Sequence, residues 1–295
     1  MTRIADTQSR AIFGNPSSPL QVSERQFDGF DDALGKLAQT PWDKIPDEDL
    51  WYYLHDLAYV ELQPDLFAYL FPVCLNFWYH TLLRNVGCAV GDAEFHYALF
   101  RGQTLEKHVT PSQRTQIFTF FHDGFLDRVD AERGFIYRDS QTPAYGWMYR
   151  FNSLGLVTPL TERIWNSWWS MNSCGQAVSA LMYLSGLMYG KGENPIFKPW
   201  TRKHGGGGPY LWENDSQIFD GGWLPTNLGF FRRTLTADYL GQKAREACQR
   251  LASEPEADMA DKICKDFEQL AEHVEIRIEY LLERLEAAHA VYFDW

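Results

Sequence analysis

Residues 64–82, PDLFAYLFPVCLNFWYHTL, decide the fold of this chain. The stretch begins with a proline at the first position of a predicted helix, where a missing N–H group is tolerated, and apolar residues then recur at three- and four-residue steps. A helix with so broad an apolar face must be covered by other elements, so we expect it to be central. Pro72 lies inside the pattern and predicts a kink or a break near residues 68–72.

Segments with helical periodicity flank this stretch on both sides. Ser23-Glu24-Arg25-Gln26 and Thr110-Pro111-Ser112-Gln113 have the spacing of a capping box, in which a hydroxyl side chain and a Glu or Gln side chain bond each other's backbone amides. Both patterns precede apolar residues at helical spacing. In addition to the helix at 64–82, the predicted helices span residues 23–38, 47–60, 111–128, 161–189, 236–252 and 258–292.

One segment has the periodicity of a strand. Tyr145, Trp147, Tyr149 and Phe151 alternate with other residues, and a period of two is typical of a β-strand. A short hairpin is therefore expected across 134–152. The predicted fold class is mainly α, with a multi-helix, bundle-like body, this small β-hairpin and a long C-terminal helix.

Three regions are expected along the chain. Residues 1–22 are predicted to form a flexible N-terminal arm, residues 23–130 an N-terminal helical region, and residues 131–295 an aromatic-rich helical region. The last region contains a long irregular loop at 190–227, rich in proline and glycine, and loops of this length usually have a role. The two helical regions are equally compatible with one integrated domain.

The predicted helix at 258–292 carries a narrow apolar stripe. Its members alternate steps of three and four residues over several turns: Phe267, Leu270, Val274, Ile278, Leu281, Leu285, Ala288 and Tyr292. Such a stripe can pack on the body of the protein or form the seam of a homodimer. The sequence fits both arrangements.

The net charge of −12 is concentrated in two segments. Residues 24–65 hold eleven acidic residues against three basic ones, and residues 254–295 hold twelve against four. Acidic surfaces of this kind repel nucleic acid and anionic lipid and accelerate encounters with basic proteins. The alternative interpretation is that these are solvated faces that keep the protein soluble.

The N-terminal residues and the cysteines indicate a compartment. Residues 1–10 are polar and lack the apolar core of a secretory signal, and the apolar stretches fall short of a membrane span. A soluble, cytoplasmic protein that does not interact with membranes is expected. The chain has five cysteines and no C-x-x-C pair, which predicts reduced packing residues rather than a disulfide or zinc framework.

No motif in the chain is typical of a particular enzymatic reaction. His204 and the four glycines after it resemble part of an esterase oxyanion loop, but no Gly-x-Ser-x-Gly elbow accompanies them. The histidines lack metal-binding spacing, although a site could still assemble from groups such as His122 and Asp123. No metal or cofactor is therefore expected. If the chain is instead an enzyme, its site is expected under the 190–227 loop, with His204, Asp215 and Asp220 as candidate groups.

Three tryptophans of the 190–227 loop differ from the others. Trp200, Trp212 and Trp223 lie outside any predicted helix, where an aromatic side chain either packs downward as an anchor or is presented to a ligand. They are our candidate anchors for a partner. The apolar Trp165, by contrast, is expected in the core.

A resemblance adds to this interpretation. The stretch Trp42-Asp-Lys-Ile-Pro46, then Phe67-Ala-Tyr-Leu-Phe-Pro72 and Thr110-Pro-Ser-Gln-Arg114, resembles a family of small bacterial proteins, with the similarity covering about residues 35–125. Proteins of this sort look like immunity partners of polymorphic or type VI secretion toxins. The whole chain is similar in character to an immunity protein for a nuclease effector.

The function expected from the sequence is the binding and neutralisation of a basic bacterial toxin. A nuclease presents a positive surface to nucleic acid, and acidic helices can occupy that surface in place of phosphates. The partner is a cognate protein toxin, and neither nucleic acid nor a membrane is a partner. The candidate partner-binding residues are the three tryptophans above and two acidic sets: Asp28, Asp31, Asp32, Glu275, Glu279 and Glu283.

Overall fold

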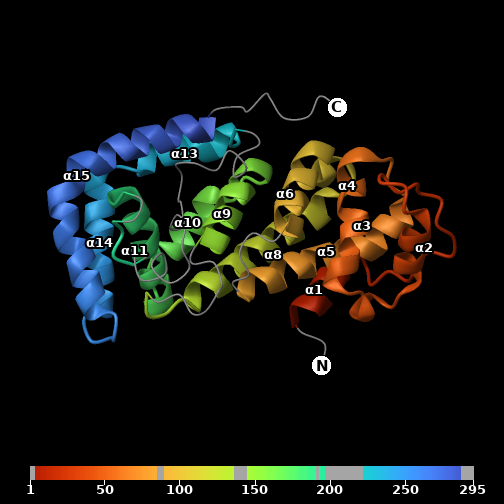
Figure 1. Cartoon of the computed structure of the whole chain (residues 1–295), viewed down its shortest axis with the longest axis horizontal. Coiled ribbons are helices and arrows are strands. Elements are labelled where there is room, and N and C mark those ends of the chain that lie inside the picture. Colours follow the sequence, from red (N-terminus) through yellow and green to blue (C-terminus); the bar gives the residue numbers. More distant parts are fainter. Residues whose placement is uncertain (1–3, 85–89, 136–144, 191–192, 197–221, 287–295) are drawn as a thin grey trace. The chain divides into compact units, whose positions relative to one another are not determined.

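The computed structural model describes residues 4–84, 90–135, 145–190, 193–196 and 222–286. Over these ranges the regular secondary structure is helical and contains no strand, so the predicted mainly α class is confirmed (Figure 1). The chain divides into two compact units. Unit 1 comprises Met1–Arg84 and Cys88–Gly124, and unit 2 comprises Asn85–Gly87 and Phe125–Trp295.

Unit 1 is built around helix α5, Pro64–Leu83, which is the stretch that opens the sequence analysis. Pro64 occupies the first helical turn, and most of the helix is buried. Pro72 removes one amide donor but does not break the helix in two, because core packing on all sides holds its two halves together. The remaining helical segments of unit 1 are α1 (Ile4–Ile12), α2 (Asp31–Gln39), η1 (Trp42–Lys44), η2 (Asp47–Leu50), α3 (Trp51–Leu54), α4 (Asp56–Tyr59), α6 (Val90–Gly102), α7 (Thr104–Lys107) and the first part of α8 (Pro111–Asp130).

Helix α5 is long and apolar enough to cross a membrane by length and composition alone. Of its apolar 18-residue window, 72% is buried inside the protein. A core helix with this degree of burial passes the same test, because apolar residues serve core packing and lipid contact equally well.

The predicted flexible arm at residues 1–22 contains a packed helix. Helix α1 contacts α5, and the ring of Phe13 lies edge-on to Phe67 and Phe71, with centroid distances of 5.9 and 5.8 Å. Ile12 is buried, and the Arg10 guanidinium lies over the Trp42 ring. The polar composition of the segment concealed these few apolar contacts, which are enough to dock it.

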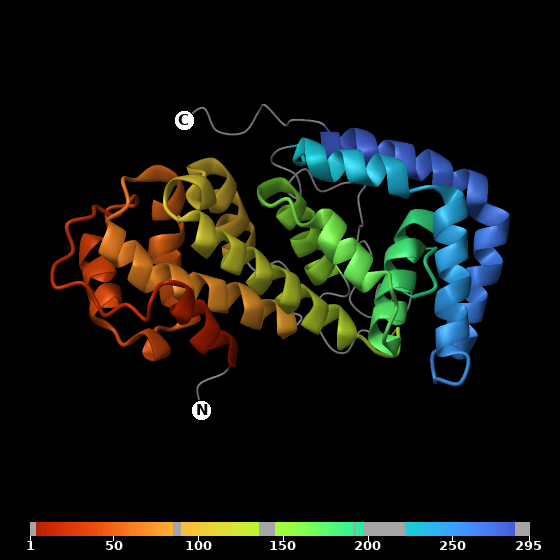
Figure 2. The ribbon, with the colours of Figure 1, turned by 180° about the vertical axis from the view of Figure 1, so that it is seen from behind.

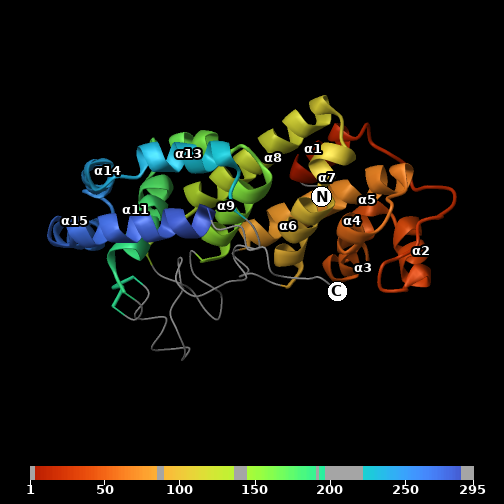
Figure 3. The same cartoon turned by 90° about the horizontal axis from the view of Figure 1, so that it is seen from above.

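The first two predicted helices are shorter than expected. Helix α2 begins at Asp31 and not at residue 23, because residues 19–30 form an irregular segment with a turn at residues 27–29, which we call the strap. The helix predicted at 47–60 is divided into η2, α3 and α4. Helices α3 and α4 lie beside α6 (Figure 3).

Helix α8 confirms the second capping box. The Gln113 amide donates to Thr110 Oγ1 at 3.3 Å, and the Thr110 amide donates to Gln113 Oε1 at 2.9 Å. Pro111 at the first helical position presets the helical φ angle. The helix continues to Asp130, close to the predicted end at 128, and the boundary between the two units falls within it.

The predicted hairpin at 134–152 is wrong wherever the structure describes it. Residues 145–157 form α9, Tyr145–Val157, and residues 136–144 lie outside the described ranges. Residues 146–157 are all buried. A helix that is buried on every side needs no polar face, so its apolar residues lose the period of 3.6 and can alternate by chance.

The single helix predicted at 161–189 is two helices, α10 (Thr161–Trp168) and α11 (Cys174–Met188). Met171 adopts a left-handed φ of 52°, and the Ser173 hydroxyl accepts a hydrogen bond from the Gln176 amide. This N-cap starts a new helix in a different direction. The core of unit 2 lies where α9, α10 and α11 bring together Trp147, Phe151, Trp165, Trp168 and Tyr183.

Three helices complete unit 2: α13 (Pro225–Thr234), α14 (Ala237–Leu251) and the long α15 (Ala257–Glu286). Helix α14 matches the predicted 236–252, and α15 matches the described part of the predicted 258–292, whereas α13 was not predicted. Residues 287–292, with Ala288 and Tyr292 of the predicted stripe, lie outside the described residues. Helices α14 and α15 lie side by side as a helical hairpin (Figure 2). The apolar stripe of α15 faces α11, α13 and α14, and Leu281 and Leu285 are fully buried there. The stripe therefore packs on the body of unit 2.

The prediction that the cysteines are reduced is wrong for two of them, which lie in this helical hairpin. Cys248 on α14 and Cys264 on α15 form a disulfide, although all five cysteines were expected to be reduced. Residues 16 apart in sequence meet here because two adjacent helices fold back on each other. Cys74 and Cys174 are free.

Candidate protein-interaction surfaces

An exposed group of aromatic side chains covers part of unit 1. Phe27 and Phe30 on the strap are 50% and 53% exposed, and Tyr59 at the end of α4 is 38% exposed. We call this group the aromatic face. Its members are Phe27, Phe30, Trp51, Tyr52, His55, Tyr59 and Tyr97.

The rings of the aromatic face contact one another. Phe27 stacks on Tyr59 with a centroid distance of 4.4 Å and meets His55 edge-on at 6.1 Å. Trp51 lies 4.7 Å from His55 on its other side. The hydroxyl of Tyr59 donates to that of Tyr97 on α6 at 3.2 Å. Chain segments far apart in sequence thus contribute to one surface.

The local sequence explains why these rings point outward. Trp51, His55 and Tyr59 follow one another at steps of four, so they share one side of the α3 and α4 turns. Leu54 and Leu57 lie on the opposite side and are buried. The aromatic spacing within an acidic segment is the signal that sequence reasoning could have used, and it was missed.

Hydrogen bonds to neighbouring side chains fix the course of the strap. Gln63 Oε1, just before α5, accepts from the backbone amides of Ser23 at 2.7 Å and Glu24 at 3.2 Å. Asp56 Oδ1 on α4 accepts from the Phe27 amide at 2.8 Å. The position of Phe27 is therefore set by a buried carboxyl group of the core.

Glu24 and Asp56 form a buried carboxyl pair beneath the aromatic face. Glu24 is 6% exposed and Asp56 is 0% exposed, and Glu24 Oε1 and Asp56 Oδ2 are both buried without a hydrogen-bond partner among the described residues. Burial raises the pKa of Asp56 to about 8; the Phe27 amide opposes the shift, and the Glu24 carboxylate adds to it. Burial also raises the pKa of Glu24. The pair therefore retains a proton at neutral pH, because two adjacent buried carboxylates cannot both ionise cheaply.

The three aspartates predicted to bind a partner lie at the strap and the start of α2. Asp28 Oδ2 is 2.8 Å from His55 Nδ1, so Asp28 joins the aromatic face directly. Asp31 pairs with Arg25 at 2.6 Å and accepts from the Gln26 amide, and these bonds lower the pKa of Asp31. Asp32 is exposed. The structure thus places all three on one segment, with Asp31 holding the strap.

The second acidic set lies on α15. Glu275, Glu279 and Glu283 follow at steps of four and are all exposed, as are Glu268 and Glu272. We call these five residues the glutamate ridge. None of them forms an ion pair with a residue that the structure describes. Ile276 and Tyr280 lie between the ridge residues and are 64% and 43% exposed.

Of the three tryptophans predicted to anchor a partner, only Trp223 lies among the described residues. Trp223 is 4% exposed and packs against Phe151 and Phe231, and a Cβ atom at Gly155 would lie 2.4 Å from its indole ring. Trp223 therefore belongs to the core of unit 2 and is not presented to a partner, which corrects the prediction. Trp200 and Trp212 lie outside the described residues, as do the candidate enzyme groups His204, Asp215 and Asp220.

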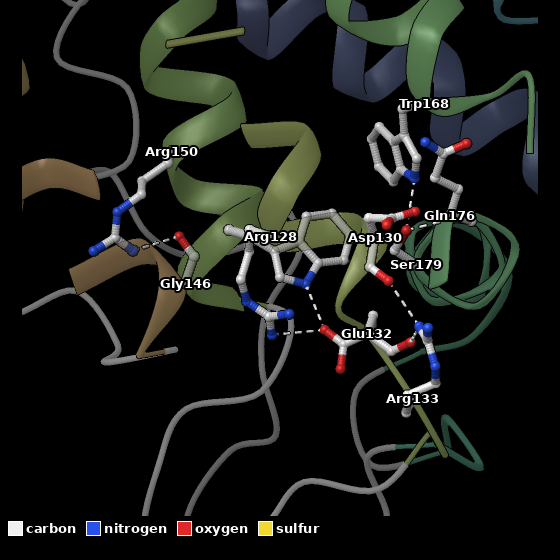
Figure 4. A network of polar contacts seen from close by, with 10 residues as sticks. Arg128, Asp130, Glu132, Arg133, Gly146, Arg150, Trp168, Gln176 and Ser179 are labelled. Atoms are coloured by element: carbon white, nitrogen blue, oxygen red, sulfur yellow. Dashed lines mark hydrogen bonds and ion pairs between the residues drawn. The ribbon is translucent and has the colours of Figure 1, made fainter. Parts of the chain in front are cut away.

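Unit 2 also contains a buried polar network, shown in Figure 4. The Arg128 guanidinium donates to Glu132 Oε2 at 2.7 Å, and the Trp147 indole donates to the same oxygen at 3.1 Å. Arg133 donates to the Asp130 carbonyl at 2.7 Å. The buried Arg128 and Glu132 neutralise each other, and the Trp147 bond joins the end of α8 to α9, so these contacts serve the fold rather than a ligand.

The described residues contain little that would hold a small ligand. No cluster of three or more potential metal ligands occurs among the residues that are described. A hollow of about 570 Å³ lies between the strap and α2, lined by residues 19–25 together with Asp31, Gly35 and Gln39. Its only paired charges are Arg25 and Asp31, which already satisfy each other.

The sequence matches no known protein-family profile, and neither a characterised protein nor a solved structure shows significant similarity to it. The resemblance to bacterial immunity partners therefore stays a hypothesis. Two surfaces remain as candidates for binding a partner, the aromatic face and the glutamate ridge.

Proposed function

We propose that this chain is an immunity protein that binds and neutralises a basic bacterial toxin, a nuclease effector of a type VI secretion system, in the cytoplasm. It does so without catalysis, by covering the surface with which the toxin binds nucleic acid. The resemblance over residues 35–125 and the acidic charge of both ends of the chain support this assignment.

The observation that carries the proposal is the glutamate ridge of α15. Like charges at steps of four on one helix face repel each other by about 0.2–0.5 kcal/mol per pair. Since none of the five forms an ion pair with a described residue, the ridge bears this repulsion in the free protein. A basic partner relieves it and gains long-range attraction on approach.

The proposal is tested by expressing the product of the gene next to this one in a bacterium, alone and together with this chain. We expect the product alone to degrade nucleic acid and stop growth, and co-expression to restore growth. A neighbour that is harmless, or whose toxicity is unchanged by this chain, contradicts the proposal. Purified proteins should also form a complex that excludes DNA from the toxin.

A further inference from the structure

We propose that the aromatic face of unit 1 anchors the partner and that it does so by binding arginine side chains. This inference rests on the proposed function and names the surface and the chemistry by which the basic partner is held. The occupant is an arginine-bearing segment of a basic protein.

The aromatic face is partly exposed to solvent. Large aromatic side chains that are clustered on a protein surface mark interaction sites, because each leaves much apolar area in water. Phe27 and Phe30 each expose about half of their surface. Tyrosine, tryptophan and phenylalanine are also the residues enriched at the centre of protein interfaces.

The chemistry of the face selects arginine. A guanidinium group stacks on aromatic rings and at the same time pairs with a carboxylate, whereas the ammonium group of lysine is compact and strongly hydrated. Asp28 lies within the face, uses Oδ2 for His55, and keeps 33% of its side chain exposed. Ring faces and an accessible carboxylate oxygen thus lie together within a segment that holds eleven acidic residues.

Unit 1 itself contains an example of this contact. The guanidinium of Arg10 lies 4.5 Å from the centroid of the Trp42 ring. Arg10 also donates to the Pro16 carbonyl at 2.8 Å, so one guanidinium combines a ring contact with a hydrogen bond. The aromatic face offers the same pair of interactions to an arginine from outside.

The face is also held in place before binding. The amide of Phe27 is bonded to Asp56, and that of Phe30 to Gln26 Oε1 at 2.9 Å. The Gln26 side chain donates in turn to the Tyr52 carbonyl at 3.0 Å. A surface that is ordered in the free state loses little entropy on binding, which favours tight association.

The test uses three fluorescent twelve-residue peptides that are identical except for four positions occupied by arginine, lysine or glutamate. We expect the arginine peptide to bind the full-length protein most tightly, the lysine peptide several-fold more weakly, and the glutamate peptide not to bind. Phe27→Ala and Tyr59→Ala should each weaken the arginine peptide about tenfold, whereas Tyr59→Phe, which keeps the ring, should bind as the wild type does.

Leu83→Ala is the matched control, because Leu83 is an exposed apolar residue of the same unit, 39% accessible, that contributes no ring. It should leave binding unchanged. Equal binding of the arginine and lysine peptides, or equal binding by Tyr59→Ala and the wild type, overturns the inference. Tyr59 is exposed, so this variant is expected to fold, and its melting temperature verifies that.

The experiments distinguish a failure of this inference from a failure of the proposed function. If Phe27→Ala and Tyr59→Ala still neutralise the toxin while a Glu275→Lys, Glu279→Lys, Glu283→Lys triple variant does not, the aromatic face is not the anchor and the proposed function stands. If the wild-type chain neutralises nothing but binds the arginine peptide through these rings, the proposed function fails and the arginine-binding face remains. Pairing of two copies of this chain through the face, detected as a dimer that Tyr59→Ala abolishes, also overturns the inference.

Discussion

At the scale of single residues, the carboxyl pair of Glu24 and Asp56 is the feature with the clearest energetic consequence. A carboxyl group whose pKa is higher in the folded than in the unfolded state binds more protons when folded. Its contribution to stability is complete below the unfolded pKa near ~4 and is lost as the pH rises through the folded value. For Asp56 that value is about 8.

We therefore expect the wild-type protein to lose stability between pH 6 and pH 9, by on the order of 2–3 kcal/mol from this pair. Asp56→Asn supplies a permanent N–H donor to Glu24 and keeps an oxygen for the Phe27 amide, so this variant should show a smaller loss. Asp32→Asn, at an exposed aspartate, is the control and should follow the wild type. Thermal melts at both pH values measure the difference, and parallel curves for wild type and Asp56→Asn would contradict the shared proton.

Residue-level contacts also explain why two similar patterns gave different structures. Thr110-Pro111-Ser112-Gln113 forms the capping box because both of its side chains find only local partners. In the corresponding pattern from Ser23, the Gln26 side chain donates to the Tyr52 carbonyl and accepts from the Phe30 amide, and the Glu24 carboxylate accepts from the Gln63 amide. Hydrogen-bond partners that are distant in sequence replace the local capping bonds here. A pattern of four residues cannot show that such distant partners exist.

At the scale of elements, periodicity predicted the helices that keep a polar face, and the proline in the first turn also marked the start of the buried α5, but periodicity failed at the buried α9 and at the break between α10 and α11. Helices α8, α14 and α15 were predicted nearly to their ends, since each keeps a polar face. The sequence of α9 alternates like a strand, and the sequence from 161 to 189 predicts one helix, because a fully apolar segment shows neither its helical period nor its breaks. The aromatic face was missed because it combines the strap, α4 and α6, which only the tertiary fold brings together.

The α15 stripe gives a prediction at this scale. Leu281 and Leu285 are fully buried, so Leu281→Asp or Leu285→Asp places a charge in an apolar contact and should destabilise unit 2 by about 3 kcal/mol or more. Ile276→Asp, on the exposed side of the same helix, should cost less than about 0.5 kcal/mol. Urea unfolding of the three variants measures the contrast. Equal stabilities would show that the stripe does not pack as described.

The glutamate ridge gives a second element-scale prediction. Reversing Glu275, Glu279 and Glu283 to Lys should slow association with the toxin on the order of tenfold at low salt and leave the melting temperature nearly unchanged. The wild-type on-rate should fall as salt rises, because the Debye length shrinks to about 10 Å at 0.1 M. Reversing Asp28, Asp31 and Asp32 tests the other acidic set. An on-rate that is independent of both salt and charge refutes electrostatic steering.

At the scale of the whole molecule, the two acidic segments and the middle of the chain differ in which side chains they expose. Both acidic segments expose side chains that the fold does not need, namely the aromatic face in unit 1 and the glutamate ridge in unit 2. The described middle of the chain, by contrast, buries its tryptophans and pairs the buried Arg128 with Glu132. This contrast is why we look for the partner at the acidic segments.

The strap has one consequence that amide hydrogen exchange would reveal. Residues 23–30 belong to no helix, yet the amides of Ser23, Glu24, Gln26, Phe27 and Phe30 each donate to a side-chain oxygen. Slow deuterium uptake is usually the mark of helices and strands, because their amides are bonded along the backbone. This irregular segment should take up deuterium slowly at these five positions, and its protection should collapse above pH 8 as the Glu24 and Asp56 pair loses its proton.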